Sequence, residues 1–387
     1  MEHPEQGAVL ARQPLLDARL QVAGHLLRAQ DGEGRGHADL AWLVERQHEQ
    51  AHPGLILLDA GEQALGPPSA HVFSASSLVL RLSRASLPEP VLDWLAAWRS
   101  VQVGVCVPLD MLAATPALLP HLTHVELQAA GPLERQAQAL AGRGLQLVVS
   151  GASDWEQAQA CSRLGLSLLA GPLLQQGALH GKKGLNASQA VIVEAMNLVA
   201  RNADLRELDA VLRRDAALSF RLFRYINSAG FGLGMQVQSL RHAVTLLGYG
   251  TLQRWLALLL ATSGGSVHAH AMLQEAVCRA RMAELLGGRL LGKRDADELF
   301  MVGMFSLLDR LLGIPMEKVL QQVKLPDSVG EALLHRGGVY GPFLQLVESC
   351  DSAQGDSARL AEALFISADT VNEIQLQALV WARLIQE

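Results

Sequence analysis

The side chains that could carry metal chemistry are few and widely spaced in this sequence. His268 and His270 have the one-residue spacing that some metal sites use, but no carboxylate or cysteine lies within three positions of them. A zinc site needs about three or four protein ligands together. We therefore expect these histidines to be ordinary surface residues in a loop that follows Gly264 and Gly265.

Phosphate-loop and cysteine chemistry are not indicated either. The glycine-rich segments 181–184 and 263–266 lack the Gly-x-x-x-x-Gly-Lys-Ser/Thr pattern that cradles phosphates. No two cysteines form a Cys-x-x-Cys pair, so neither a zinc ribbon nor a disulfide framework is predicted. The four cysteines are Cys106, Cys161, Cys278 and Cys350.

Composition excludes several classes of protein. Half of the 387 residues are apolar, which is enough for large cores and excludes a disordered chain. The 32 basic and 38 acidic residues give a net charge of −6, and aromatic residues make up 4%, which argues against nucleic-acid binding. The polar N-terminus is unlike a signal peptide, and no apolar run approaches the roughly 20 residues of a membrane span. We expect a cytoplasmic protein without nucleic-acid or membrane partners.

The N-terminal part alternates short apolar runs with amphipathic stretches. Strands are predicted at 71–82, 101–107, 122–127, 145–149 and 166–170, with helices between them, and two earlier strands, at 8–12 and 20–29, form an antiparallel hairpin. Ser153 is predicted to cap one helix, with Glu156 completing a capping box. Repeated strand–helix–strand units predict parallel strands with right-handed crossovers, and so a (β/α) barrel, complete or incomplete.

The sequence pattern of the C-terminal part predicts an all-α domain. Asp204, Asp215 and Ser239 are each placed to cap a helix that carries an apolar face, and Gly248 closes the last of these helices. A turn-rich stretch at 171–186 separates the two parts. The predicted organisation is a barrel domain at 1–175, a linker at 176–187 and a helical domain at 188–387.

Three stretches of the helical part resemble the signature of HDOD domains: 215–222, 225–229 and 239–248. Segment 11–17, Ala-Arg-Gln-Pro-Leu-Leu-Asp, resembles the opening of two-domain EAL–HDOD signalling proteins, and 142–174 resembles the end of an EAL domain. The similarity covers nearly the whole chain. The signature residues Asp215, Asn227, Ser228 and Gly248 suit helix ends, so we expect them to be structural.

The resemblance implies chemistry that this sequence lacks the residues to perform. EAL domains generally hydrolyse cyclic di-GMP with two divalent metals, and HDOD domains are related to HD-type phosphohydrolases. The metal-ligand positions of EAL domains map near Arg81, 106–108, Glu126 with Gln128, and Ser150, and one carboxylate cannot hold two dications. The adjacent His-Asp pair maps to Ser306 and Leu307; Asp309, two residues later, would face the other side of a continuous helix. No enzyme activity, metal or cofactor is expected.

The resemblance therefore implies a non-enzymatic bacterial signalling scaffold or regulatory adaptor. It would act through protein–protein interaction, with an input changing how the two domains pack. Arg221 and Arg224, three residues apart on one helix face, are either solvated or a patch for an acidic partner. A homodimer is expected from the resemblance, because EAL domains commonly pair.

Two other functions stay open. The first is a cyclic di-GMP receptor that binds without cleavage, for which Arg81, Arg84 and Glu126 are the candidate ligand-binding residues. The second is an active phosphodiesterase that uses unaligned carboxylates, namely Asp110, Glu126 and Asp154.

Overall fold

A computed structural model describes residues 8–30, 54–59, 77–82, 91–164, 166–173, 184–226, 237, 239–263 and 269–385. Contacts between Cα atoms divide the chain into two units. The barrel unit consists of Met1–Gln176 and Glu348–Glu373, and the helical unit of Gly177–Val347 and Ile374–Glu387. Segment Glu348–Glu373 therefore groups with the barrel, although its sequence reads as part of the helical region.

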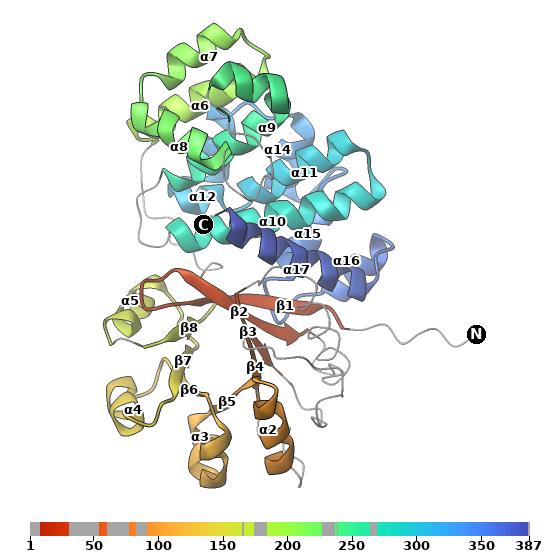
Figure 1. The fold of residues 1–387 in the computed structure, drawn as a ribbon. Helices are drawn as coiled ribbons and strands as arrows, with labels where there is room; N and C mark the ends of the chain where they lie inside the picture. Colours follow the sequence, from red (N-terminus) through yellow and green to blue (C-terminus); the bar gives the residue numbers. More distant parts are fainter. Residues whose placement is uncertain are drawn as a thin grey trace, which may run out of the picture. The chain divides into compact units, whose positions relative to one another are not determined.

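The barrel unit contains a closed eight-stranded barrel, as the alternation of strands and helices predicts (Figure 1). Only the first strand runs against its neighbours: β1 pairs antiparallel with β2 and β8, and all other pairs are parallel. The strands are β1 (Leu10–Leu16), β2 (Val22–Ala29), β3 (Leu55–Asp59), β4 (Leu78–Arg81), β5 (Gly104–Pro108), β6 (His124–Gln128), β7 (Gln146–Ser150) and β8 (Leu168–Ala170).

Apolar side chains from almost every strand fill the barrel interior, since alternate residues of a strand face inward. The buried cluster consists of Leu15, Leu26, Leu57, Val79, Cys106, Val148, Leu168 and Ala170. The hairpin between β1 and β2 turns at Asp17, whose Oδ1 accepts hydrogen bonds from the backbone N–H groups of Arg19 and Gln21. An interior filled in this way is a packed core, so chemistry is confined to the rim of the barrel.

Short helices follow the later strands and lie outside the barrel (Figure 1). They are α2 (Val91–Ser100), α3 (Leu109–Ala114), the 3₁₀ helix η2 (Pro116–His121), α4 (Leu133–Leu140) and α5 (Trp155–Arg163). The predicted cap of α5 is wrong by one residue: Asp154, not Ser153, is the N-cap, and its side chain accepts from the N–H of Gln157.

The helical unit begins with α6 (Ala187–Ala200), which has a complete capping box between Asn186 and Gln189. The predicted caps Asp204 and Ser239 are confirmed, and Gly248 interrupts α9 with a φ of 76°. The other helices of this unit are α7 (Leu205–Leu212), α8 (Ala216–Ile226), α9 (Leu240–Thr262), α10 (Ala269–Leu290), α11 (Lys293–Phe305), α12 (Leu308–Leu312), α13 (Met316–Gln322), α14 (Asp327–His335) and α15 (Gly341–Ser349). Helix α16 (Ser357–Ala363) belongs to the barrel unit, and α17 (Ala368–Leu384) begins in the barrel unit and ends in the helical unit.

Segment Glu348–Glu373 is bound to the β1–β2 hairpin by specific polar contacts within the barrel unit. The backbone N–H of Arg12 donates to the carbonyl of Cys350 at 2.7 Å, and Nη2 of Arg12 lies 2.6 Å from Oδ1 of Asp351. Gln30 donates to the carbonyls of Ser349 and Ser352. Asn372 exchanges two hydrogen bonds with the backbone of residues 8 and 10.

Helices α10 and α11 approach closely at Gly303. A Cβ there would lie 2.6 Å from the backbone of Ala280, a contact that no real side chain makes. Gly303→Ala is therefore expected to lower the free energy of unfolding of the helical unit by about 1–3 kcal/mol, measured by urea unfolding. Gly330→Ala on α14 is the matched control, since nothing lies within 4 Å of the added atom and helix propensity favours alanine by about 1 kcal/mol. Equal effects of the two changes would contradict this packing argument.

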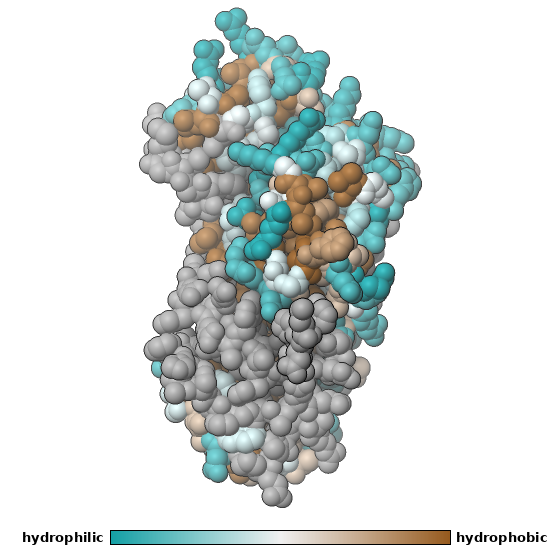
Figure 2. All heavy atoms as spheres, turned by 90° about the vertical axis from the view of Figure 1, so that its right-hand side faces the viewer, coloured by the Kyte–Doolittle hydropathy of each residue, from teal (hydrophilic) through white to brown (hydrophobic). Residues whose placement is uncertain are grey.

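Hydrophobic atoms gather in one area of the surface seen in Figure 2, with hydrophilic side chains around them. Exposed apolar residues of the helical unit include Leu290, Leu334 and Val339. Single exposed apolar residues are ordinary on protein surfaces, so we assign no site from them. None of the helices in the described ranges combines the length and apolarity that a membrane crossing requires.

Candidate functional site

Charged side chains gather where the parallel strands of the barrel end. Asp59 is the last residue of β3 and Arg81 the last residue of β4, and the register places them opposite each other. Glu126 of β6 lies opposite Pro108, at the end of β5. Because the carboxyl ends of parallel strands meet at one rim of a barrel, the fold brings these residues together.

Arg81 is the centre of this group. Its Nε donates to Oε2 of Glu126 at 2.7 Å, and its Nη1 donates to Oδ2 of Asp59 at 2.9 Å. The exposed fractions of the side chains are 15% for Arg81, 7% for Asp59 and 4% for Glu126. Burial by itself lowers the pKa of Arg81, but the two carboxylates outweigh it and raise the pKa above its ordinary value. The guanidinium therefore stays charged and binds both acids.

Each of the two carboxylates has a further partner as well. Ser150 of β7 donates to Oε1 of Glu126 at 2.5 Å and accepts from Gln128 at 3.1 Å. Arg28 of β2 donates its Nε to Oδ2 of Asp59 at 2.7 Å. We call Arg28, Asp59, Arg81, Glu126 and Ser150 the rim network. Sequence reasoning missed Arg28 and Asp59, although each is a charged residue near the end of an apolar strand.

The divalent metals that an EAL resemblance implies do not fit the rim network. A metal pair needs several free carboxylates, whereas Asp59 and Glu126 both bind Arg81. No group of three or more His, Cys, Asp or Glu side chains that could hold a metal ion occurs in the described part of the chain. Cys106 lies beside Arg81 in the sheet, and burial raises the pKa of its thiol, which stays protonated.

The other carboxylates considered for catalysis serve the local backbone. Asp110 accepts from the N–H of Met111 in the first turn of α3. Hydrogen bonding from the Gln157 backbone, with a smaller contribution from Ser153, lowers the pKa of Asp154, the N-cap of α5. Of the predicted trio Asp110, Glu126 and Asp154, Glu126 is the member that belongs to the rim network.

The HDOD signature residue Asp215 contacts both its own helix and a neighbouring one. Asp215 accepts from the N–H of Leu218 at 2.9 Å, which caps α8, and from the hydroxyl of Ser188 on α6 at 2.7 Å. Arg221 lies on α8 and is partly exposed. Several predicted residues fall outside what the structure describes: Arg84, Asn227, Ser228, His268 and the side chain of Arg224.

At the position of the His-Asp pair, the helix expected to run to Asp309 ends instead. Ser306 is the C-cap of α11, and Asp309 belongs to the separate helix α12, so the expected rotation about one helix axis does not apply. The hydroxyl of Ser306 accepts from Nη1 of Arg279 at 3.0 Å and donates to the carbonyl of Gly303. Arg279 is 6% exposed, and this buried cation was missed from the sequence.

Comparison with known proteins agrees with this two-part arrangement. Residues 186–322 match the HDOD domain family. The cyclic di-GMP phosphodiesterase CdgJ of Vibrio cholerae is 23% identical over 400 residues, which cover 97% of this chain and 92% of CdgJ. The chain is thus an EAL–HDOD two-domain protein: an eight-stranded barrel followed by a helical region that contains the HDOD domain.

Other similarities cover only part of the chain. The uncharacterized protein YuxH of Bacillus subtilis is 30% identical over 183 residues, or 46% of this chain and 44% of YuxH, so the match spans less than half of that relative. An EAL protein of Vibrio cholerae in its c-di-GMP-bound form is 10% identical, with a TM-score of 0.33 over 44% of this chain and 91% of that one. The EAL domain of Mycobacterium smegmatis DcpA is 16% identical, with a TM-score of 0.32 over 43% of this chain and 88% of that one.

Proposed function

We propose that this chain is a non-enzymatic member of cyclic di-GMP signalling, a scaffold or regulatory adaptor that works through protein–protein contacts. The relative CdgJ is a cyclic di-GMP phosphodiesterase, which supports the signalling context. The observation that carries the non-enzymatic part is the Arg81 guanidinium bound between Asp59 and Glu126. It places a fixed positive charge where a phosphodiesterase would need metal ions, and occupies the carboxylates that would bind them.

The helical unit supports the same proposal independently. Where an HD hydrolase has its His-Asp pair, a buried arginine donates to Ser306. A guanidinium has only hydrogen-bond donors and no metal-binding lone pair. Both regions that hydrolytic relatives use for metals therefore contain an arginine cation in this chain.

Mixing the purified protein with cyclic di-GMP and Mg²⁺ or Mn²⁺ is expected to yield no linear product. Cleavage is followed by chromatography, and binding by calorimetry on the same samples with and without metal. Glu126→Gln is the matched variant, because it removes the one rim carboxylate that the phosphodiesterase alternative requires. Metal-dependent product that Glu126→Gln abolishes would overturn the proposal.

Binding without product would support the receptor alternative. The rim favours that alternative in one respect: the side chain of Arg28 is 43% exposed, so it presents a cation to solvent beside the buried ion pairs. If heat is released in the titration, Arg28→Met is expected to weaken cyclic di-GMP binding. If the titration releases no heat and the assay yields no product, the scaffold proposal is supported. Capture of the protein partner would then be the next experiment.

A further inference from the structure

Helix α17 belongs to both units of the chain. Its residues up to Glu373 group with the barrel unit, and those from Ile374 onward group with the helical unit. Every residue from 368 to 384 is helical, and this stretch contains neither glycine nor proline. Helices kink almost always at such residues or where a side chain or water enters the hydrogen-bond ladder. Helix α17 is therefore one stiff element, about 25 Å long.

In the barrel unit, Asn372 fixes the first part of α17 to the backbone at the start of β1. Its Oδ1 accepts from the N–H of Leu10 at 2.9 Å, and its Nδ2 donates to the carbonyl of Ala8 at 2.9 Å. Asn372, Ala8 and Leu10 are all buried. Loss of this amide would therefore take a partner from two backbone groups that water does not reach, which is costly.

In the helical unit, Trp381 fixes the last part of α17. Its ring meets the ring of Phe300 on α11 edge to face, with the centroids 5.9 Å apart and the planes at 89°. Cζ of Arg281 on α10 lies 5.4 Å from the centroid of the Trp381 ring, and Cζ of Arg254 on α9 lies 4.5 Å from that of Phe300. Edge-to-face aromatic pairs and cation–π contacts are both stabilising, so this anchor joins α17 to three helices.

We propose that α17 couples the stability of the two units, so that loosening Asn372 from β1 loosens the packing around Trp381, and the reverse. The two anchors are nine positions apart, about 14 Å along the helix axis. Sites more than about 10 Å apart usually respond independently, so a response between them identifies the helix as the connection. Coupling between sites is reciprocal, which makes both directions testable. The coupling goes beyond the proposed signalling function and involves no ligand.

Hydrogen–deuterium exchange of the full chain tests the first direction. Asn372→Ala is expected to speed exchange in α10 around Arg281 and in α11 around Phe300 by about fivefold or more, since coupled sites commonly change each other's equilibria by about 5–150-fold. Alanine favours a helix more than asparagine does, so the change does not weaken α17 itself. Arg12 and Gln30 still bind the earlier part of segment Glu348–Glu373.

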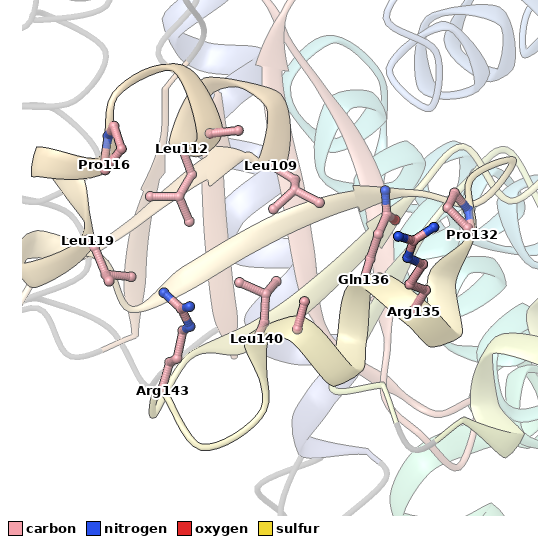
Figure 3. A pocket seen from close by; sticks show the side chains of 11 residues that line it. Leu109, Leu112, Pro116, Leu119, Pro132, Arg135, Gln136, Leu140 and Arg143 are labelled. Carbon is pink, nitrogen blue, oxygen red and sulfur yellow. The ribbon is translucent and has the colours of Figure 1, made fainter.

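An apolar groove between α3, η2 and α4 supplies the control for this variant (Figure 3). Leu140 on α4 is a buried residue of its lining, and none of the lining residues belongs to segment Glu348–Glu373. Leu140→Ala destabilises the barrel unit because a buried apolar side chain is shortened. It should leave exchange in α10 and α11 unchanged, since it does not alter the Asn372 anchor.

The reverse direction starts from the helical unit. Trp381→Leu keeps an apolar side chain but removes both ring contacts, and it is expected to speed exchange of the Leu10 N–H, which donates to Asn372. Val211→Ala is the matched control. Val211 is buried on α7, which packs on α6, α8 and α9, so its truncation should leave the Leu10 N–H as protected as in the wild type.

A glycine between the two anchors tests whether the helix itself carries the effect. Gln377 lies between Asn372 and Trp381 on α17. With Gln377→Gly in the chain, Asn372→Ala should reach α10 and α11 less, because glycine makes a helix interior more flexible. Gln377→Ala removes the same side chain but keeps the helix stiff, so in that chain the effect of Asn372→Ala should persist.

Three results would overturn the proposal. The first is an effect of Asn372→Ala that stays within the barrel unit. The second is an equal effect of Leu140→Ala on α10 and α11, which would mean that any loss of barrel stability spreads to the helical unit. The third is a Leu10 N–H that Trp381→Leu leaves fully protected. All of these measurements are made without cyclic di-GMP, so this proposal and the proposed function fail separately.

Discussion

Arg12→Met is expected to lower the free energy of unfolding of the barrel unit by about 3–5 kcal/mol, because it leaves a poorly hydrated carboxylate without its cation. The side chain of Arg12 is fully buried, and that of its partner Asp351 is 13% exposed. Methionine fills similar space but cannot neutralise Asp351. The stability loss should therefore come from charge and not from a cavity.

Urea unfolding followed by tryptophan fluorescence measures this loss, since Trp98 and Trp155 lie buried in the barrel unit. Arg359→Met is the matched control on the same segment. Arg359 pairs with Asp356, but their side chains are 71% and 58% exposed, so solvent screening limits the effect to about 1 kcal/mol or less. Limited proteolysis should also cut Arg12→Met more readily within 348–373. Equal stability of the two variants would show that the buried pair does not hold this segment.

The place of segment Glu348–Glu373 in the fold could not be predicted from local sequence patterns. The helices predicted from the periodicity of residues 360–386 are confirmed, since α16 and α17 occur there. Periodicity cannot tell which unit a helix contacts, however. Gln30 and Ser349 are 319 residues apart in the sequence, and only the folded chain brings their polar atoms together. The sequence therefore predicts the elements of this segment but not its place in the barrel unit.

The barrel itself was predictable for a physical reason. Most of its strands are short apolar runs followed by amphipathic helices. The connections in such strand–helix–strand units are almost always right-handed, so successive strands lie side by side and parallel. The observed strands differ from the predicted ones at their ends: β5 begins at Gly104 instead of residue 101, and β4 covers Leu78–Arg81 where a strand at 71–82 was predicted. The strand Leu55–Asp59 was not singled out, because five consecutive mostly apolar residues do not distinguish a buried strand from part of a helix.

The rim network was predictable in part. Arg81 and Glu126 were named because the metal-ligand positions of EAL domains map near them, and the structure brings the two residues into contact. Asp59 and Arg28 were missed because their strands had not been aligned with the others. The break before α12 carries no local signal, since residues 306 and 307 are serine and leucine, which any helix accepts. Whether these residues bind a ligand stays a prediction.

Arg81→Met is expected to destabilise the barrel unit by about 3–5 kcal/mol, since it leaves two buried carboxylates next to each other. Asp59 would keep Arg28, and Glu126 would keep the hydroxyl of Ser150. The reason is again desolvation: the exposed fractions of these acids are 7% and 4%. Unfolding in urea at neutral pH measures the loss, by the same fluorescence signal.

Arg28→Met is the sharpest control, because Arg28 and Arg81 donate to the same oxygen of Asp59 but differ in burial. Arg28 is 43% exposed, so screening should reduce its contribution to about 1 kcal/mol or less. Adding Glu126→Gln to Arg81→Met should recover part of the loss, which a double-mutant cycle measures. If Arg81→Met costs no more than Arg28→Met, Arg81 is not the cation that neutralises these acids. The rim carboxylates would then be free for metal, and the argument for a non-enzymatic barrel would lose the observation that carries it.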